Sequence, residues 1–206
     1  MLISVWKDPC PPVLASTSPT RRQLLSAIGL EVIAVAPEVD ERSVEAGLQR
    51  IGATPDKIAL ELARAKAAAV SGRYPDHWVI AADQTLACDG EQFHKPGGLG
   101  DAAAQLRRLS GRTHELHASV CCSRNGVVQY EHVETARMTM RSFSDEFLQD
   151  YLALAGPSVS MSVGGYQIEG LGLHLFEKID GAHATILGLP LLPLLGFLRS
   201  AGALQA

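Results

Sequence analysis

Cysteine, aromatic residues and an excess of charge of one sign are all scarce in this chain of 206 residues. The cysteines form no C-x-x-C pair, so the sequence indicates neither a disulfide framework nor a zinc ribbon. We expect reduced, buried thiols, which suit the cytosol, at Cys10, Cys88, Cys121 and Cys122. The net charge is only −4, from 18 basic and 22 acidic residues. This balance argues against binding of nucleic acid or an anionic membrane through bulk electrostatics.

A long hydrophobic run is also missing. The most apolar segment, 186–198, has 13 residues and contains Pro190 and Pro193, whereas a membrane span needs about 20 apolar residues. The first ten residues lack the apolar run and small-residue cleavage site of a signal peptide. We therefore expect a cytoplasmic protein that does not bind membranes.

Signals for strands and helices alternate along the chain, and 47% of its residues are hydrophobic. Apolar runs or alternation predict strands near 13–15, 32–36, 78–82, 116–122, 136–140 and 173–179. Capping residues predict helices beginning after Ser18, Thr54, Asp101 and Ser144 and at Pro190. We expect the second helix to bury a stripe of Ile58, Leu62, Ala65 and Ala69. The prediction is an α/β (mixed α+β) fold, a mixed sheet flanked by helices, in one domain over 1–206.

The segment LASTSPTRR, 14–22, combines a strand end, a polar turn and a helix start. Free N–H groups and the dipole at a helix N-terminus suit an anion. Arg21 and Arg22 lie in the first turn, where the dipole disfavours a cation unless an anion binds nearby. The alternative is an N-cap with two solvated arginines. A P-loop is excluded because its glycine and lysine spacing is absent.

Asp83 follows the apolar run WVIAA directly. A carboxylate at the end of a buried strand is well placed to act as a base or metal ligand, although it could also cap a loop. The turn Asp89-Gly90 predicts a hairpin that would carry Lys95 back toward Asp83. Lys66 lies in a run of alanines, where an isolated helical lysine is usually solvated.

Other carboxylates are candidates for metal or substrate binding. Asp40 and Glu41 form an acidic pair after the second strand, which would suit Mg²⁺ bridging to phosphates or form a solvated turn. Glu169 lies in the glycine-rich stretch VGGYQIEGLG, where the backbone can approach a ligand closely or make a tight structural loop. The histidines give no zinc motif, and no nucleophile elbow is present.

Taken in order, these stretches resemble the Maf-like family of nucleoside triphosphate pyrophosphatases over nearly the whole chain. The matching segments are LASTSPTRR, VDE (39–41), AKA (65–67), AADQTL (81–86), KP (95–96), SGRTHEL (110–116), GGYQIEGLG (164–172) and ILGLPL (186–191). The resemblance implies a fold related to inosine triphosphate pyrophosphatases, with two lobes that share one sheet around a cleft, often as a homodimer. It also implies hydrolysis between the α and β phosphates, with a divalent cation such as Mg²⁺, Mn²⁺ or Co²⁺.

The resemblance also implies roles for particular residues. Asp83 would be the catalytic base and, together with Glu41, a metal ligand. Phosphate or substrate would be held by Ser16, Arg21, Arg22, Lys66, Lys95 and Glu169.

Four positions depart from the common pattern of the family: Thr20, Gln84, His94 and Glu169. Gln84 and Glu169 resemble the branch that acts on 7-methyl-GTP, as does LASTSP, whereas the C-terminal stretch resembles it less. Two alternatives stay open: a nucleotide-binding regulator of cell division without required catalysis, and a metal phosphatase that releases orthophosphate.

Overall fold

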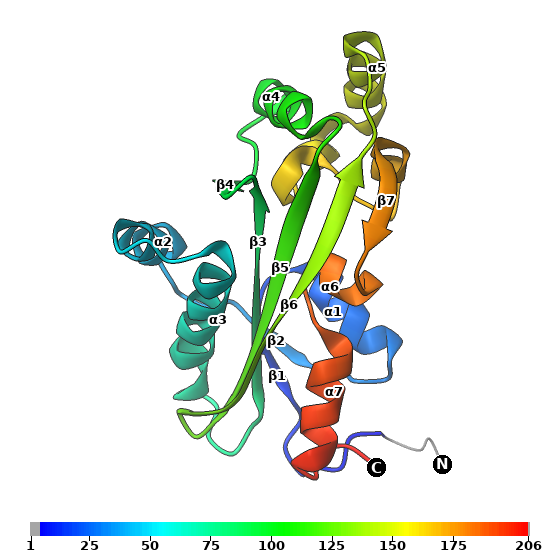
Figure 1. Ribbon diagram of the computed structural model, residues 1–206. Coiled ribbons are helices and arrows are strands. Elements are labelled where there is room, and N and C mark those ends of the chain that lie inside the picture. Colours follow the sequence, from blue (N-terminus) through cyan, green and yellow to red (C-terminus); the bar gives the residue numbers. More distant parts are fainter. Residues whose placement is uncertain (1–4, 206) are drawn as a thin grey trace. The chain divides into compact units, whose positions relative to one another are not determined.

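The computed structural model describes residues 5–205, and the chain forms two compact units. Unit 1 contains Met1–Gln84, His117–Glu134 and Ala182–Ala206, whereas unit 2 contains Thr85–Leu116 and Thr135–Gly181. The strands form a seven-stranded mixed sheet in the order β2 (Ile33–Val35), β1 (Val13–Ala15), β3 (Val79–Cys88), β5 (Thr113–Arg124), β6 (Val127–Met140) and β7 (Phe176–Asp180), with β4 (Glu91–Phe93) paired to β3 (Figure 1). The mixed α/β fold predicted from the sequence is therefore confirmed.

The strands of unit 1 begin with a parallel group. Residue Val13 of β1 pairs with Ile33 of β2 on one side and with Val79 of β3 on the other. The strands that contribute to unit 1 are β1 (Val13–Ala15), β2 (Ile33–Val35), β3 (Val79–Cys88), β5 (Thr113–Arg124) and β6 (Val127–Met140). Its helices are α1 (Pro19–Ala27), α2 (Glu41–Arg50), α3 (Pro55–Ser71), α6 (His183–Ile186) and α7 (Leu191–Ser200).

Strand β3 is buried on both faces, and its alternation assigns its side chains to two separate cores. Val79 and Ala81 pack with the alanines of α3 in one core. Ile80 and Ala82 pack with α1 and α7 in the other. The helices α3 and α7 accordingly lie on opposite faces of the sheet (Figure 1). By the same alternation, position 83 belongs to the α3 face and position 84 to the α7 face.

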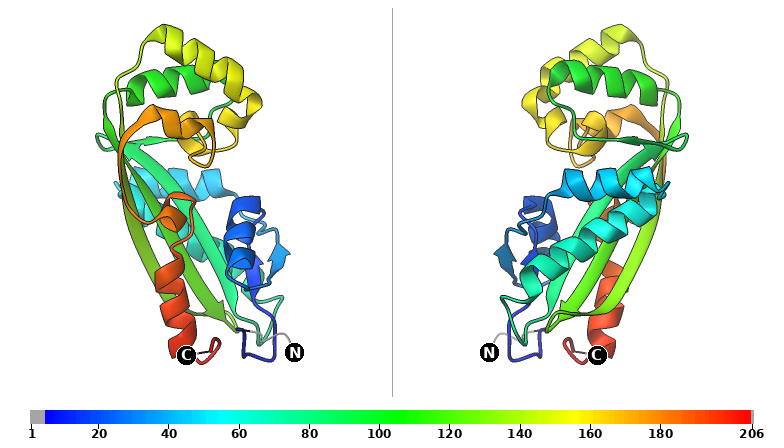
Figure 2. Two further views of the ribbon diagram at one scale, coloured as in Figure 1. Left: turned by 90° about the vertical axis from the view of Figure 1, so that its right-hand side faces the viewer. Right: turned by 90° about the vertical axis from the view of Figure 1, so that its left-hand side faces the viewer.

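Unit 2 contains the ends of β3, β5 and β6 together with β4 (Glu91–Phe93), β7 (Phe176–Asp180), α4 (Leu99–Leu109), α5 (Asp145–Ala155) and the 3₁₀ turns Gly156–Ser160, Val163–Gly165 and Leu171–Leu175. Helices α4 and α5 lie beside each other (Figure 2). The glycine-rich stretch packs tightly on α4, because a Cβ on Gly165 would lie 3.4 Å from the Cβ of Ala102. The stretch is therefore tightly packed at Gly165.

Several local predictions are confirmed. Ser18 and Ser144 accept backbone hydrogen bonds as the N-caps of α1 and α5. The turn after Asp89 joins the antiparallel strands β3 and β4, and Asp89 has a positive φ. Cys88, Cys121 and Cys122 are buried free thiols, and burial raises the pKa of all three. Cys10 was also expected to be buried, but this free thiol is only half-buried.

Other local predictions are wrong. Asp101 does not cap α4, which begins after Gly98; its carboxylate lies in the first turn and accepts from the Gly97 N–H at 3.1 Å. The strand expected at 173–179 is Phe176–Asp180, preceded by a 3₁₀ turn. Helix α2 was not expected.

No helix within residues 5–205 has the length and apolar character needed to cross a membrane. The hydrophobic segment 186–198 contains the last residue of α6 and most of α7.

Candidate active site

Helix α3 carries Lys66 on its buried face. The buried residues of the helix recur with helical spacing: Ile58, Ala59, Leu62, Ala63, Lys66, Ala67, Val70 and Ser71. The predicted stripe was therefore wrong in its second half, because Ala65 and Ala69 are only half-buried. On the same face of the helix, Ala63 and Ala67 share a core cluster with Val79 and Ala81 of β3. The side chain of Lys66 is 7% exposed, which excludes a solvated lysine.

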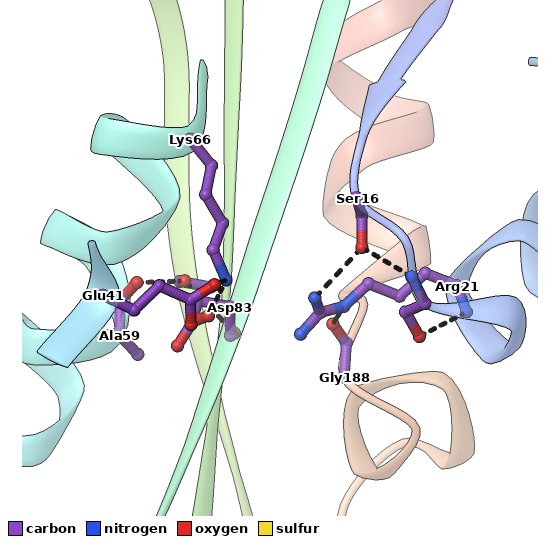
Figure 3. Close-up of polar contacts among 9 residues, drawn as sticks. Ser16, Arg21, Glu41, Ala59, Lys66, Asp83 and Gly188 are labelled. Atoms are coloured by element: carbon purple, nitrogen blue, oxygen red, sulfur yellow. Dashed lines mark hydrogen bonds and ion pairs between the residues drawn. The ribbon is translucent and has the colours of Figure 1, made fainter. Parts of the chain in front are cut away.

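Asp83 meets Lys66 from the sheet. Because Asp83 lies on the α3 face of β3, its carboxylate points at the helix, and its Oδ1 lies 2.5 Å from Lys66 Nζ (Figure 3). The Asp83 side chain is only 10% exposed. A buried carboxylate of this kind requires a charged partner, and Lys66 supplies it.

Glu41 brings a second carboxylate to the same ammonium. It is the first residue of α2, and its Oε1 lies 3.0 Å from Lys66 Nζ. Its neighbour Asp40 has a different task, since the Asp40 carboxylate accepts from the Ser43 N–H at 3.1 Å and caps the helix. The acidic pair is therefore not a solvated turn: Asp40 caps α2, and Glu41, whose side chain is 51% exposed, reaches Lys66.

Ser119 on β5 also contributes to this cluster, although nothing in the sequence indicated it. Its buried hydroxyl donates to the carbonyl of Ala59 at 2.7 Å and lies 3.3 Å from the carbonyl of Asp83. One side chain thus links the helix that carries Lys66 to the strand that carries Asp83. No motif pointed to it, because its role depends on the pairing of β5 with β3.

The Ser16–Arg21 turn forms the second part of the site. Ser16 is buried, and its Oγ accepts from the Ser18 N–H at 3.1 Å. Arg21 donates through Nε to the carbonyl of Gly188 at 2.9 Å and through Nη1 to Ser16 Oγ at 3.5 Å. The guanidinium extends from α1 toward β3 (Figure 3). Arg22, by contrast, is exposed.

The Ser16–Arg21 turn and the Lys66 cluster interact electrostatically. Burial lowers the pKa of Arg21, whereas the negative charges of Asp83 and Glu41 raise it. Arg21 therefore lies within electrostatic reach of both carboxylates and stays protonated, as arginine does in proteins. Two cations and two carboxylates, Arg21, Lys66, Glu41 and Asp83, make the group neutral overall.

Two predicted residues belong to unit 2. Lys95 follows β4 and is exposed, and Glu169 is exposed in the glycine-rich loop. Their assignment to phosphate or substrate binding stays a prediction.

The donor set suits one kind of metal. No three His, Cys, Asp or Glu side chains gather into a metal site among residues 5–205. Glu41 and Asp83, however, direct carboxylate oxygens to one point, the Lys66 ammonium. Mg²⁺ often takes one or two protein carboxylates, with substrate phosphates and water completing the shell. The residues present therefore fit a divalent cation that is shared with a phosphate ligand.

Comparison with known proteins places the chain in a family. The family model described as Maf-like protein matches residues 11–201. The chain therefore belongs to the Maf-like protein family.

Relatives about half identical to the chain are named as enzymes. A nucleoside triphosphate pyrophosphatase of Nitrobacter winogradskyi is 50% identical over 96% of this chain and 97% of its own length. One from Rhodopseudomonas palustris is 52% identical over the same shares. A 7-methyl-GTP pyrophosphatase of Rhizobium johnstonii is 52% identical over 94% of this chain and 97% of its own length.

Proposed function

We propose that this protein is a nucleoside triphosphate pyrophosphatase, which hydrolyses the α–β phosphoanhydride to a nucleoside monophosphate and pyrophosphate. The observation that carries the proposal is the buried Lys66 held between Asp83 and Glu41, with Arg21 in electrostatic reach. The names of relatives with about 50% identity support the same reaction.

Asp83 is the proposed base. Its backbone is fixed in a buried strand, so its carboxylate has a defined position. A positioned carboxylate can accept the proton that water loses as it attacks phosphorus. The ammonium of Lys66 contacts the Asp83 carboxylate and fixes its position.

Lys66 and Arg21 are the proposed phosphate-binding cations of unit 1, with Ser16 beside them. Phosphoryl transfer requires the phosphate charges to be neutralised where transition-state charge develops. The four charged groups of the site cancel one another, so a triphosphate with several negative charges needs further positive charge.

A divalent cation would supply this charge. Held by Glu41 and Asp83, Mg²⁺, Mn²⁺ or Co²⁺ would neutralise phosphate charge and lower the pKa of its bound water. Activity should disappear in excess chelator and return when one of these ions is added. Full activity in the chelator would contradict the need for a metal.

Identification of the product tests the proposed reaction. The purified protein is assayed with dTTP, UTP, the other ordinary triphosphates and 7-methyl-GTP, and pyrophosphate and orthophosphate are measured separately. Pyrophosphate release supports the proposal, and orthophosphate release supports a phosphatase instead. Binding without turnover of any triphosphate supports the nucleotide-binding regulator of cell division.

The panel also settles the preferred base. Relatives of similar identity carry both names, nucleoside triphosphate pyrophosphatase and 7-methyl-GTP pyrophosphatase. Gln84 and Glu169 favour 7-methyl-GTP, so we propose modified nucleotides as substrates. The family resemblance further favours a cytoplasmic homodimer, which sedimentation of the purified protein and fractionation of cells would test.

A further inference from the structure

The segment 182–189, which contains α6 and the turn after it, is fastened to the sheet by two side chains. The side-chain amide of Gln84 donates to the carbonyls of Thr185 and Ile186, both at 3.0 Å. The hydroxyl of Thr185, which is fully buried, donates to the carboxylate of Glu134 at 2.7 Å. Gln84 comes from β3 and Glu134 from β6, so two strands fix one short segment.

The same segment then holds Arg21. The carbonyl of Gly188 accepts from Arg21 Nε at 2.9 Å. Gly188 has a φ of +90°, a conformation that other residues rarely adopt. A Cβ at this position would lie 3.3 Å from Arg21 Nη2 and 3.5 Å from Nε. Glycine therefore permits both the turn and the close approach of the guanidinium.

These contacts decide which edge of the guanidinium is available to a ligand. Arginine has five N–H donors, and phosphates are bound by a pair of them. The Nε donor of Arg21 is engaged by Gly188, and one Nη1 donor faces Ser16 at 3.5 Å. Within residues 5–205, the other three donors, at the end of the guanidinium formed by Nη1 and Nη2, are left for an anion.

We infer that Gln84 and the Thr185–Glu134 pair are positioning residues, which set the Gly188 carbonyl and thereby aim the end of the Arg21 guanidinium at the substrate phosphates. The inference rests on the proposed function, because the reaction whose rate it concerns is the proposed hydrolysis of a triphosphate. Both N–H donors of the Gln84 amide bind carbonyls of the segment 182–189, so its effect on the Arg21 guanidinium passes through that segment.

A double-mutant cycle tests the inference. Gln84→Met keeps the size of the side chain but removes both donors, and Gln129→Met, at an exposed position on β6, is the matched control. Misplacement of a group by about 1 Å can cost about 100-fold, so Gln84→Met should lower kcat/KM by about 10- to 100-fold. The control should stay within about 2-fold of the wild type.

The cycle is then completed in an Arg21→Lys background, which lacks the planar guanidinium that Gly188 orients. Gln84→Met should there cost less than about 2-fold, because its effect passes through Arg21. Losses that multiply would overturn the inference, since Gln84 would then act independently of Arg21. Thr185→Ser, which keeps the hydroxyl, should retain more activity than Thr185→Val; equal losses would likewise count against it.

A readout without turnover separates this inference from the proposed reaction. With ¹⁵N-labelled arginine, the Nε–H of Arg21 should exchange slowly with water in the wild type and several-fold faster in Gln84→Met. An unchanged rate overturns the positioning role even if pyrophosphate is released. A faster rate in a protein that hydrolyses no triphosphate supports the positioning role and rejects the proposed function.

Discussion

Replacing Lys66 with methionine should destabilise unit 1 substantially. The substitution keeps most of the buried stem and removes the ammonium that lies 2.5 Å from Asp83 and 3.0 Å from Glu41. Removal of one partner from a buried ion pair costs about 3–5 kcal/mol, because the remaining charge stays in a poorly solvated place. Glu41 is half-exposed and can turn to water, so the cost arises chiefly at Asp83, whose side chain is 10% exposed.

Urea unfolding followed by tryptophan fluorescence measures this effect. Both tryptophans of the chain, Trp6 and Trp78, belong to unit 1, so the signal reports on that unit. The control is Lys57→Met, an exposed lysine on the same helix, which should change the free energy of unfolding by less than about 0.5 kcal/mol. Adding Asp83→Asn to Lys66→Met should recover part of the loss, since it removes the unpaired charge.

The reasoning would be refuted if Lys66→Met and Lys57→Met had equal, small effects. Lys66 would then behave as a solvated lysine, and the buried ion pair would contribute nothing measurable.

Three further predictions concern other residues. Ser119→Ala should lower the free energy of unfolding by about 1–3 kcal/mol, because the buried carbonyl of Ala59 loses its hydroxyl donor; a change below 0.5 kcal/mol in the same fluorescence assay would contradict the link. Burial lowers the pKa of His114 to about 4, below its unfolded value of about 6.5. Between these two pH values the folded protein binds fewer protons than the unfolded chain. Unit 2 should therefore lose up to about 3 kcal/mol of stability as the pH falls from about 6.5 to about 4. His114→Gln should flatten this dependence in amide hydrogen exchange of β5, and an equally steep loss in the variant would assign it to other groups. Lys95→Ala should cut pyrophosphate release by about 10- to 1000-fold without changing stability, since the side chain is exposed, and a wild-type rate would exclude Lys95 from phosphate binding.

The fold followed from periodicity and turn chemistry wherever these signals were strong. Ser18 followed by Pro19 marked the start of α1, and the Asp89-Gly90 pair marked a hairpin. Helix α2 was missed because its only large apolar side chains are Val44 and Leu48, too few to give a clear helical stripe. The 3₁₀ turn before β7 was missed because apolar residues alternate through it as they do in a strand.

The site was predictable as a set of residues but not as a geometry. Asp83 was indicated by its place after an apolar run, but the strand predicted to end there continues to Cys88, so Asp83 lies within β3. The burial of Lys66 was not indicated, since an alanine-rich helix can present either face to a sheet. The contacts of Ser119, Gln84 and Gly188 join residues up to 167 positions apart, and only the folded sheet brings them together.

Asp83→Asn tests the central claim most directly. The substitution keeps the size of the side chain and removes the base and its charge. Pyrophosphate release should fall by about 100-fold or more, the range expected for a general base. Calorimetric binding of the same triphosphate should persist or tighten, because repulsion between carboxylate and phosphate is relieved. If the folded variant releases pyrophosphate at the wild-type rate, Asp83 is not the base and the proposed mechanism is contradicted.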